Sequence, residues 1–220
     1  MPKEYRLPQG VVSELARHDH VLGVDEAGVG SWAGPAIVCA VVVPASWSLE
    51  GLTDSKKMTP AARQRLYPSL KELMHVVVRL DVEEIDSEGI GRALPQAHAR
   101  AVREARRCHA ESGHAQAPFA IIDGINAVEG ATAVPKADSL VQAVSAASVI
   151  AKVTHDEILR QLDHVYPGYG FASHLGYGSP AHRRALLELG VSRCHRMSYA
   201  PMRSLVQRDG DILAVLGEVE

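Results

Sequence analysis

Gly23-Val-Asp-Glu-Ala-Gly-Val-Gly-Ser-Trp-Ala-Gly-Pro35 is the stretch of this 220-residue chain that decides the fold. Its apolar start, residues 21–25, and the apolar run at residues 37–43 predict two strands, and the glycines between them predict a broad connecting loop. The first strand therefore ends at Asp25, with Glu26 directly after it. Two adjacent carboxylates thus stand where the strand meets the loop.

Strands and helices alternate along the rest of the chain. Thr59 is a suitable helix N-cap with Pro60 in the first turn, and Gly113 ends the next helical pattern. Further strands are predicted at residues 76–80, 119–123 and 132–134, and helices at residues 59–73, 92–112, 139–164 and 180–189. This order predicts an α/β fold.

The chain is expected to divide at two places. Residues 1–19 form an amino-terminal extension, and residues 20–165 form the main domain because no linker or repeat interrupts them. Residues 166–220 are rich in glycine and proline before their helix. We therefore expect a small helical carboxy-terminal part that completes the cleft of the main domain.

Composition describes an ordinary globular protein. Hydrophobic residues make up 46% and charged residues 22%, which excludes a disordered or fibrous chain. The apolar run at residues 37–43 is too short to span a bilayer and no signal-peptide core follows Arg6, so we expect a cytoplasmic protein without membrane contact. Three scattered cysteines predict neither a disulfide framework nor a zinc site. The eleven histidines suggest no metal-binding pair and are expected mainly at the surface.

Charge is distributed unevenly, although the net charge is only −3. Residues 152–208 carry eight Lys or Arg against four Asp or Glu, with five histidines, and the rest of the chain is correspondingly acidic. A basic region fits a polyanionic partner such as nucleic acid, but a solvated helical face explains it equally well. Charge alone therefore leaves the partner open.

Four carboxylates occupy informative positions. Asp25 and Glu26 end the first strand, Asp123 ends a later one, and Asp138 stands before a long helix. If they meet at one edge of the sheet, their mutual repulsion requires a positive centre. Mg²⁺ and Mn²⁺ prefer carboxylate oxygens, and two such ions about 4 Å apart can drive phosphodiester hydrolysis. Each of these acids also fits a purely structural role. Asp25, Glu26 and Asp123 suit turns, and Asp138 suits a helix N-cap.

Five blocks follow one another in the order of a known family. The first is the Gly23–Pro35 stretch. The others are Gly51-Leu-Thr-Asp-Ser-Lys-Lys57, Ile122-Asp-Gly124, Lys136-Ala-Asp138 with Ser145-Ala-Ala-Ser-Val-Ile-Ala-Lys-Val-Thr154, and His174-Leu-Gly-Tyr177 with His182 and His195-Arg196. Together they span roughly residues 20–202 and resemble ribonuclease HII. The resemblance implies a ribonuclease H-like mixed sheet flanked by helices, with a small helical carboxy-terminal part.

The resemblance also implies an activity. The family hydrolyses the RNA strand of RNA–DNA hybrids and incises 5′ to single ribonucleotides in duplex DNA, leaving 5′-phosphate and 3′-hydroxyl ends. It makes Asp25, Glu26, Asp123 and Asp138 the catalytic residues and the ligands of two Mg²⁺ or Mn²⁺ ions, with Asp25 bridging both. No obligate protein partner is evident, and we expect a monomer.

A second set of residues is expected to bind the substrate. Gly28 and Gly30 would let the backbone approach the ribose 2′-hydroxyl, and Tyr177 would place its ring beside the sugar. The expected phosphate contacts, each of which also has an ordinary surface reading, are Ser55, Lys56, Lys152 and Arg196.

The chain departs from the family pattern in the loop. Val29 stands where arginine is usual, Ser31-Trp32 replaces Pro-Leu, and His155 replaces arginine after Val-Thr. Val29 stays in the expected substrate-binding loop through its backbone, but it cannot make charge-assisted bonds to a phosphate. Two alternatives therefore stay open: a hybrid nuclease restricted to longer RNA tracts, and a weakly active hybrid-binding protein. Ribonuclease HIII also lacks this arginine but normally has a further amino-terminal domain, so an atypical ribonuclease HII is favoured.

Overall fold

A five-stranded mixed sheet forms the centre of the fold in the computed structural model, which describes residues 5–204. The strands lie in the order β3-β2-β1-β4-β5. Their bounds are β1 His20–Ala27, β2 Ala36–Pro44, β3 Met74–Leu80, β4 Phe119–Asp123 and β5 Thr132–Val134. The α/β class and the ribonuclease H-like mixed sheet predicted from the sequence are confirmed.

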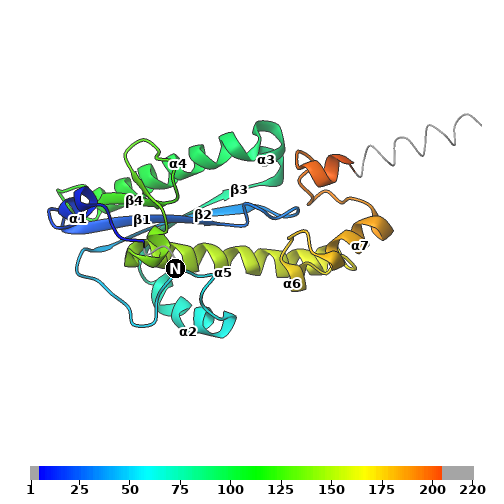
Figure 1. Cartoon of the computed structure of the whole chain (residues 1–220), viewed down its shortest axis with the longest axis horizontal. Coiled ribbons are helices and arrows are strands. Elements are labelled where there is room, and N and C mark those ends of the chain that lie inside the picture. Colours follow the sequence, from blue (N-terminus) through cyan, green and yellow to red (C-terminus); the bar gives the residue numbers. More distant parts are fainter. Residues whose placement is uncertain (1–4, 205–220) are drawn as a thin grey trace, which may run out of the picture. The chain divides into compact units, whose positions relative to one another are not determined.

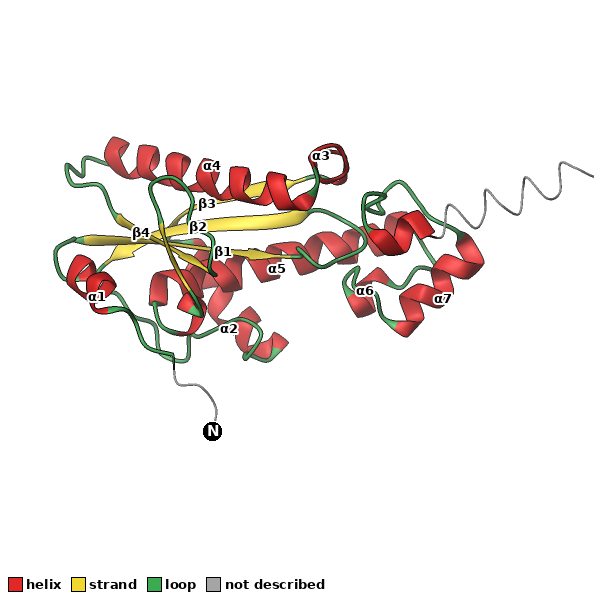
Figure 2. Cartoon of the chain, turned by 45° about the horizontal axis from the view of Figure 1, so that its top comes forward, coloured by secondary structure: helices red, strands yellow, loops and turns green. Residues whose placement is uncertain are grey.

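Helices precede, connect and follow the strands along the chain. Their bounds are α1 Gln9–Leu15, α2 Pro60–Lys71, α3 Val82–Glu88, α4 Ile90–Glu111, α5 Gln142–Val165, α6 Phe171–His174 and α7 Pro180–Leu189, with a 3-10 turn, η1, at Ala137–Ser139. Figures 1 and 2 show α4 along one face of the sheet and α5 along the other. Among residues 5–204, no helix has the length and apolarity that a membrane span needs.

Strand pairing fixes which strand ends share an edge. β1 pairs antiparallel with β2, so that Asp25 lies opposite Cys39. It also pairs in parallel with β4, where Val24 lies opposite Ile122. Because parallel strands run in the same direction, the residues that follow this pair, Asp25 and Asp123, come at the same edge of the sheet.

Small residues let α5 lie directly on β1. A Cβ added at Gly23 would stand 2.2 Å from the backbone carbonyl carbon of Ala143, well inside van der Waals contact. The neighbouring α5 residues Val144, Ala146 and Ala147 are fully buried. Gly23 is therefore required for helix–sheet packing.

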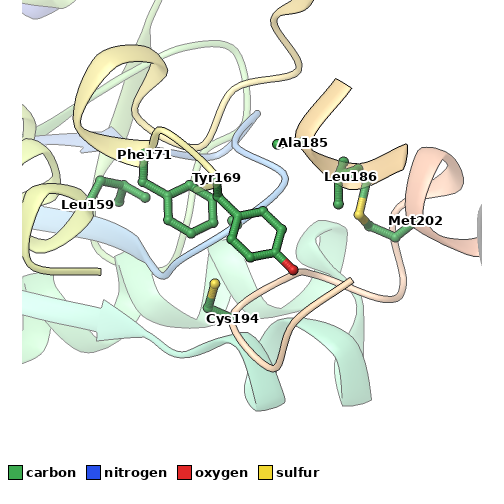
Figure 3. Close-up of a cluster of buried hydrophobic side chains, with 8 residues drawn as sticks. Leu159, Tyr169, Phe171, Ala185, Leu186, Cys194 and Met202 are labelled. Atoms are coloured by element: carbon green, nitrogen blue, oxygen red, sulfur yellow. The ribbon is translucent and has the colours of Figure 1, made fainter. Parts of the chain in front are cut away.

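The chain forms two compact units. The first comprises Met1–Ala27, Ile37–Arg79 and Leu94–Thr154, and the second comprises Gly28–Ala36, Leu80–Ala93 and His155–Glu220. The second unit has its own apolar cluster, in which the rings of Tyr169 and Phe171 stack 5.3 Å apart (Figure 3). Other members of this cluster are Ala33, Leu159, Ala185, Leu186, Cys194 and Met202.

Most of these elements were predicted from residues close to them in the sequence. The Thr59 side chain accepts a hydrogen bond from the backbone N–H of Ala62 at 3.1 Å, which confirms the predicted N-cap of α2. The helix predicted to follow Asp138 directly begins only at Gln142, and Asp138 lies in η1.

The histidines were predicted to lie mainly at the surface. This prediction is wrong for five of them, which are buried: His98, His109, His155, His182 and His195.

Candidate active site

The four predicted carboxylates lie in the first unit. Asp25 and Glu26 belong to the last part of β1, Asp123 is the last residue of β4, and Asp138 lies in η1. Electrostatic interactions link Asp25 to Glu26 and to Asp123, and Asp123 to Asp138. The fold thus gathers carboxylates from distant parts of the chain into one group.

Asp25 is the most enclosed member of the group, with 2% of its surface exposed. Its Oδ1 accepts a hydrogen bond of 2.8 Å from the backbone N–H of Glu26. The hydroxyl of Ser148, on α5, also hydrogen-bonds to the Asp25 side chain and lies 2.8 Å from Ser55 Oγ. Among residues 5–204, the second oxygen, Oδ2, is buried and has no hydrogen-bond partner.

Burial changes the protonation of two of these acids. It raises the pKa of Asp25 to about 8, and the neighbouring charges of Glu26 and Asp123 add to the shift. Burial also raises the pKa of Asp138 to about 6, and the charges of Asp123 and Asp54 add to this shift. Without a cation, both carboxyls therefore hold protons at pH values where an exposed aspartate is ionised.

Asp54 is a fifth carboxylate of this group that the sequence analysis did not single out. It is 4% exposed, its Oδ1 accepts a hydrogen bond of 2.8 Å from the backbone N–H of Lys56, and its side chain hydrogen-bonds to Asp138. Two carboxyls can hydrogen-bond only if one of them carries a proton. Asp54 stands within the Gly51–Lys57 block, so that block contained the signal.

Lys56 lies among the carboxylates. Asp25, Asp54 and Asp138 raise its pKa against the opposing effect of desolvation. The ammonium group is therefore held in its charged form by the acids around it. Lys56 therefore lies within electrostatic reach of these acids and offsets part of their charge. The phosphate contact expected of it from the sequence stays a prediction.

His98 is a second neighbour that the sequence analysis missed. It projects from α4, is 7% exposed, and its Nε2 lies 3.0 Å from Glu26 Oε2. A buried imidazole at this distance fixes the direction of the Glu26 carboxylate. Helical periodicity alone does not reveal such a contact, because Glu26 and His98 are 72 residues apart.

The donor set fits hard divalent cations. Asp25 Oδ2 and Asp123 Oδ1 are both buried, and neither has a hydrogen-bond partner in the part of the chain that the structure describes. An unpartnered buried oxygen is costly, and a metal ion would satisfy it. Carboxylate oxygens without any sulfur ligand suit Mg²⁺ or Mn²⁺.

The glycine-rich loop, residues 28–36, belongs to the second unit and is fixed there by Arg196. This side chain is fully buried and donates hydrogen bonds to the carbonyl oxygens of Gly34 and Val29, both at 2.9 Å. The Tyr199 hydroxyl donates to the same Val29 oxygen. We expected Arg196 to hold phosphates, but its burial assigns it to the loop instead.

Ser31 and His155, two buried residues of the second unit, contact each other. The Ser31 hydroxyl lies 3.3 Å from His155 Nε2, and both residues are fully buried. The backbone N–H of Trp32 donates to the carbonyl oxygen of Gly176 at 2.8 Å. Ser31 and His155 thus form a matched pair inside the second unit.

The two loop glycines differ in what they require. Gly28 has φ +81°, and an added Cβ would lie 2.2 Å from His155 Cδ2. Gly30 is exposed, and a Cβ there would make only an ordinary contact, 3.7 Å from Tyr177 Cε1. The loop conformation therefore requires glycine at position 28. At position 30 the backbone is exposed next to the Tyr177 ring.

The remaining predicted substrate residues differ in exposure. Tyr177 is 39% exposed, as a ring that meets a ligand must be. Lys152, on α5, is half-buried, and Ser55 is only 3% exposed. Ser55 lies within hydrogen-bond distance of Ser148, whose hydroxyl also hydrogen-bonds to Asp25. Ser55 therefore supports the Asp25 side chain through Ser148.

Comparison with known proteins identifies the family of the chain. The sequence profile of the family described as Ribonuclease HII matches residues 22–202. The chain belongs to the ribonuclease HII family. A ribonuclease HII of Hyphomonas neptunium is 43% identical over 200 residues, which cover 85% of this chain and 96% of that protein. The chain is accordingly a ribonuclease H, an endonuclease that acts on RNA strands, and members of this group depend on divalent metal ions.

Solved structures of ribonucleases H share the fold. Ribonuclease H2 from Pyrococcus horikoshii superposes with a TM-score of 0.67 and 27% identity, covering 86% of this chain and 98% of that one. Bst ribonuclease HIII, solved in complex with Mn²⁺, superposes with a TM-score of 0.70 at 20% identity, covering 94% of this chain and 76% of that one. The second likeness concerns the fold alone.

Metal-free protein should lose stability as pH rises. Because Asp25 and Asp138 have pKa values raised from 3.8 to about 8 and about 6, the folded state binds more protons than the unfolded state between these values. Their stabilising contribution is complete below about pH 4 and is lost as pH passes through 6 and 8. Asp25→Asn should abolish the loss near pH 8 and there raise the free energy of unfolding by at least about 1.4 kcal/mol, the equivalent of one pKa unit.

Urea unfolding in a chelating buffer at several pH values measures this effect. Asp19→Asn, at an exposed aspartate, is the matched control and should follow the wild-type pH profile. Equal profiles for Asp25→Asn and the wild type would contradict the burial argument.

Gly28→Ala should disrupt the loop, whereas Gly30→Ala should not. The first change combines a left-handed backbone with a collision against His155, at a cost of about 1–3 kcal/mol. The second should stay within about 0.5 kcal/mol of the wild type. Thermal unfolding of the two variants side by side checks this difference, and equal losses of stability would refute it.

Proposed function

We propose that this ribonuclease HII cleaves the RNA strand of RNA–DNA hybrids with two divalent ions and also incises 5′ to single ribonucleotides in duplex DNA. The products would be 5′-phosphate and 3′-hydroxyl ends. The observation that carries the two-ion proposal is the pair of unpartnered buried oxygens, Asp25 Oδ2 and Asp123 Oδ1, in a group of interacting carboxylates.

Asp25 is suited to bridge two ions. One of its oxygens is fixed by the Glu26 N–H, and the other has no partner among the described residues. Asp123 would hold one ion, and Asp138 and Glu26 would complete the ligands. The ions, Mg²⁺ or Mn²⁺, would activate the attacking water and stabilise the leaving 3′-oxygen.

The protein residues prepare this arrangement before substrate binds. His98 orients Glu26, and Ser148 orients Asp25. Lys56 offsets part of the negative charge, which lowers the repulsion among the acids in the free enzyme. In the reaction, water attacks phosphorus, the bond to the 3′-oxygen breaks, and that oxygen takes up a proton.

The loop and Tyr177 would supply substrate selectivity. A protein distinguishes RNA from DNA by contact with the 2′-hydroxyl. The exposed Gly30 backbone beside the partly exposed Tyr177 ring can offer an amide and a sugar-stacking surface together. Gly28 and Val29 would present the neighbouring backbone, and Lys56 and Lys152 would attract the duplex phosphates.

A restriction to longer RNA tracts is the second candidate, and Val29 favours it. The valine cannot form the charge-assisted phosphate contact of an arginine, so several consecutive ribonucleotides would be needed for the same grip. A protein that binds hybrids with little turnover is less well supported, because buried carboxylates without partners serve metal binding and have no use in a pure binder.

Asp138→Asn should abolish cleavage while preserving hybrid binding, because the change removes a ligand charge and leaves the duplex contacts in place. The assay offers wild-type protein a DNA duplex with one ribonucleotide and a duplex with a long RNA tract, each with Mg²⁺ or Mn²⁺. Cleavage of both supports the first candidate, and cleavage of the tract alone supports the second. Gel retardation without cleavage by the wild type would contradict both.

Val29→Arg should tighten duplex binding through one added phosphate contact. We expect the slope of log affinity against log salt to steepen by about 0.9, the value for one released counterion on B-DNA. Val29→Gln, with a polar side chain but no charge, is the matched control and should keep the wild-type slope. An unchanged slope in Val29→Arg would show that position 29 does not face the phosphates.

A further inference from the structure

Three histidines form a cluster in the first unit that the proposed reaction does not use. His20 is the first residue of β1, His109 lies in the last turn of α4, and His114 follows that helix. Each offers a ring nitrogen, and these three nitrogens all lie within 4.8 Å of one another. The sequence analysis missed the cluster because its members share no regular spacing.

His109 has the arrangement of a metal ligand. It is 1% exposed, and its Nε2 is buried with no hydrogen-bond partner among the described residues. The ring also hydrogen-bonds to the backbone of Gln116, which by elimination involves Nδ1. Metal-binding histidines commonly donate one N–H to a backbone carbonyl, and this bond leaves the other nitrogen as a lone-pair donor. An imidazole nitrogen that is buried and unpartnered otherwise costs stability.

The segment that carries His114 is held close to the start of β1. The Gln116 side chain accepts a hydrogen bond from the Asp19 N–H and donates one to the Arg17 carbonyl, both at 3.1 Å. The ring centroids of His20 and His114 lie 4.4 Å apart, and those of His109 and His114 lie 4.3 Å apart. The three imidazoles therefore meet in the protein without any ligand.

We propose that His20, His109 and His114 bind one divalent transition-metal ion of the zinc class. Imidazole nitrogens suit Zn²⁺, Ni²⁺ and Cu²⁺ better than Mg²⁺, which prefers oxygen. Nitrogens around a tetrahedral Zn²⁺ lie about 3.3 Å apart for Zn–N bonds of about 2.0–2.1 Å. Binding therefore requires the nitrogens to approach one another and the exposed His114 ring, which stacks on His109 with 7° between the ring planes, to turn until its lone pair points at the ion. Water would take the fourth position, on the exposed side of His114.

This site is distinct from the carboxylates. His20 and Asp25 lie five residue steps apart on β1, a distance of about 17 Å along an extended strand. A bound ion would join the start of β1 to the end of α4, and it would stabilise the folded state by mass action. It would leave Mg²⁺-dependent cleavage unchanged, because no carboxylate of the candidate active site is involved.

Cobalt binding tests the proposal on tag-free, full-length protein treated with chelator and then supplied with excess Mg²⁺. Co²⁺ bound by nitrogen in a tetrahedral site absorbs visible light much more strongly than Co²⁺ held by six oxygens. The wild type should gain one such ion, and Zn²⁺ should displace it. His114→Asn and His20→Asn should each weaken binding by more than the roughly 10- to 100-fold that loss of an outer hydrogen-bond partner costs. His164→Asn, at an exposed histidine of α5, should bind as the wild type does.

Ribonuclease activity with Mg²⁺ is measured on the same samples and should be equal in all four proteins, which shows that each variant is folded. The proposal is overturned if the wild type shows no strong visible band, or if His114→Asn retains wild-type affinity. A thiolate charge-transfer band would overturn it as well, because that band would place the ion on a cysteine.

Discussion

The parallel pairing of β1 with β4 is the constraint on which the candidate active site depends. It brings the residues after Val24 and Ile122 to one edge of the sheet, although nearly a hundred residues separate them. Without this register, Asp25 and Asp123 could not interact. The close packing of α5 on Gly23 serves the same end, because it places Ser148 against the Asp25 side chain.

Gathering acids in this way stores free energy at the site. The repulsion among these acids is lowered because the pKa values of Asp25 and Asp138 are raised and because Lys56 supplies a positive charge. A divalent ion can replace those protons and satisfy the unpartnered oxygens at once. Metal affinity and pH are therefore coupled, since the ligands must release protons before they can bind.

The sequence predicted what depends on local signals. The Thr59 cap, the strand that ends at Asp123 and the helix Pro180–Leu189 all follow from nearby residues. The resemblance to ribonuclease HII supplied the roles of the carboxylates, which spacing alone left open. The sequence could not predict side-chain contacts between distant elements. The pairing of His98 with Glu26 and the cluster around His20 each join residues far apart in sequence. Such contacts leave no periodic pattern in the sequence.

The loop conformation is held by residues of its own unit. Its backbone is held by Arg196 through the carbonyl oxygens of Val29 and Gly34, and these bonds do not involve the side chain at position 29. The Ser31 hydroxyl and the His155 ring contact each other inside the same unit. Because none of these contacts uses the Val29 side chain, we expect a substitution at position 29 to leave the backbone hydrogen bonds of the loop in place. We therefore expect its effect to fall on duplex binding and not on the chemistry at the carboxylates.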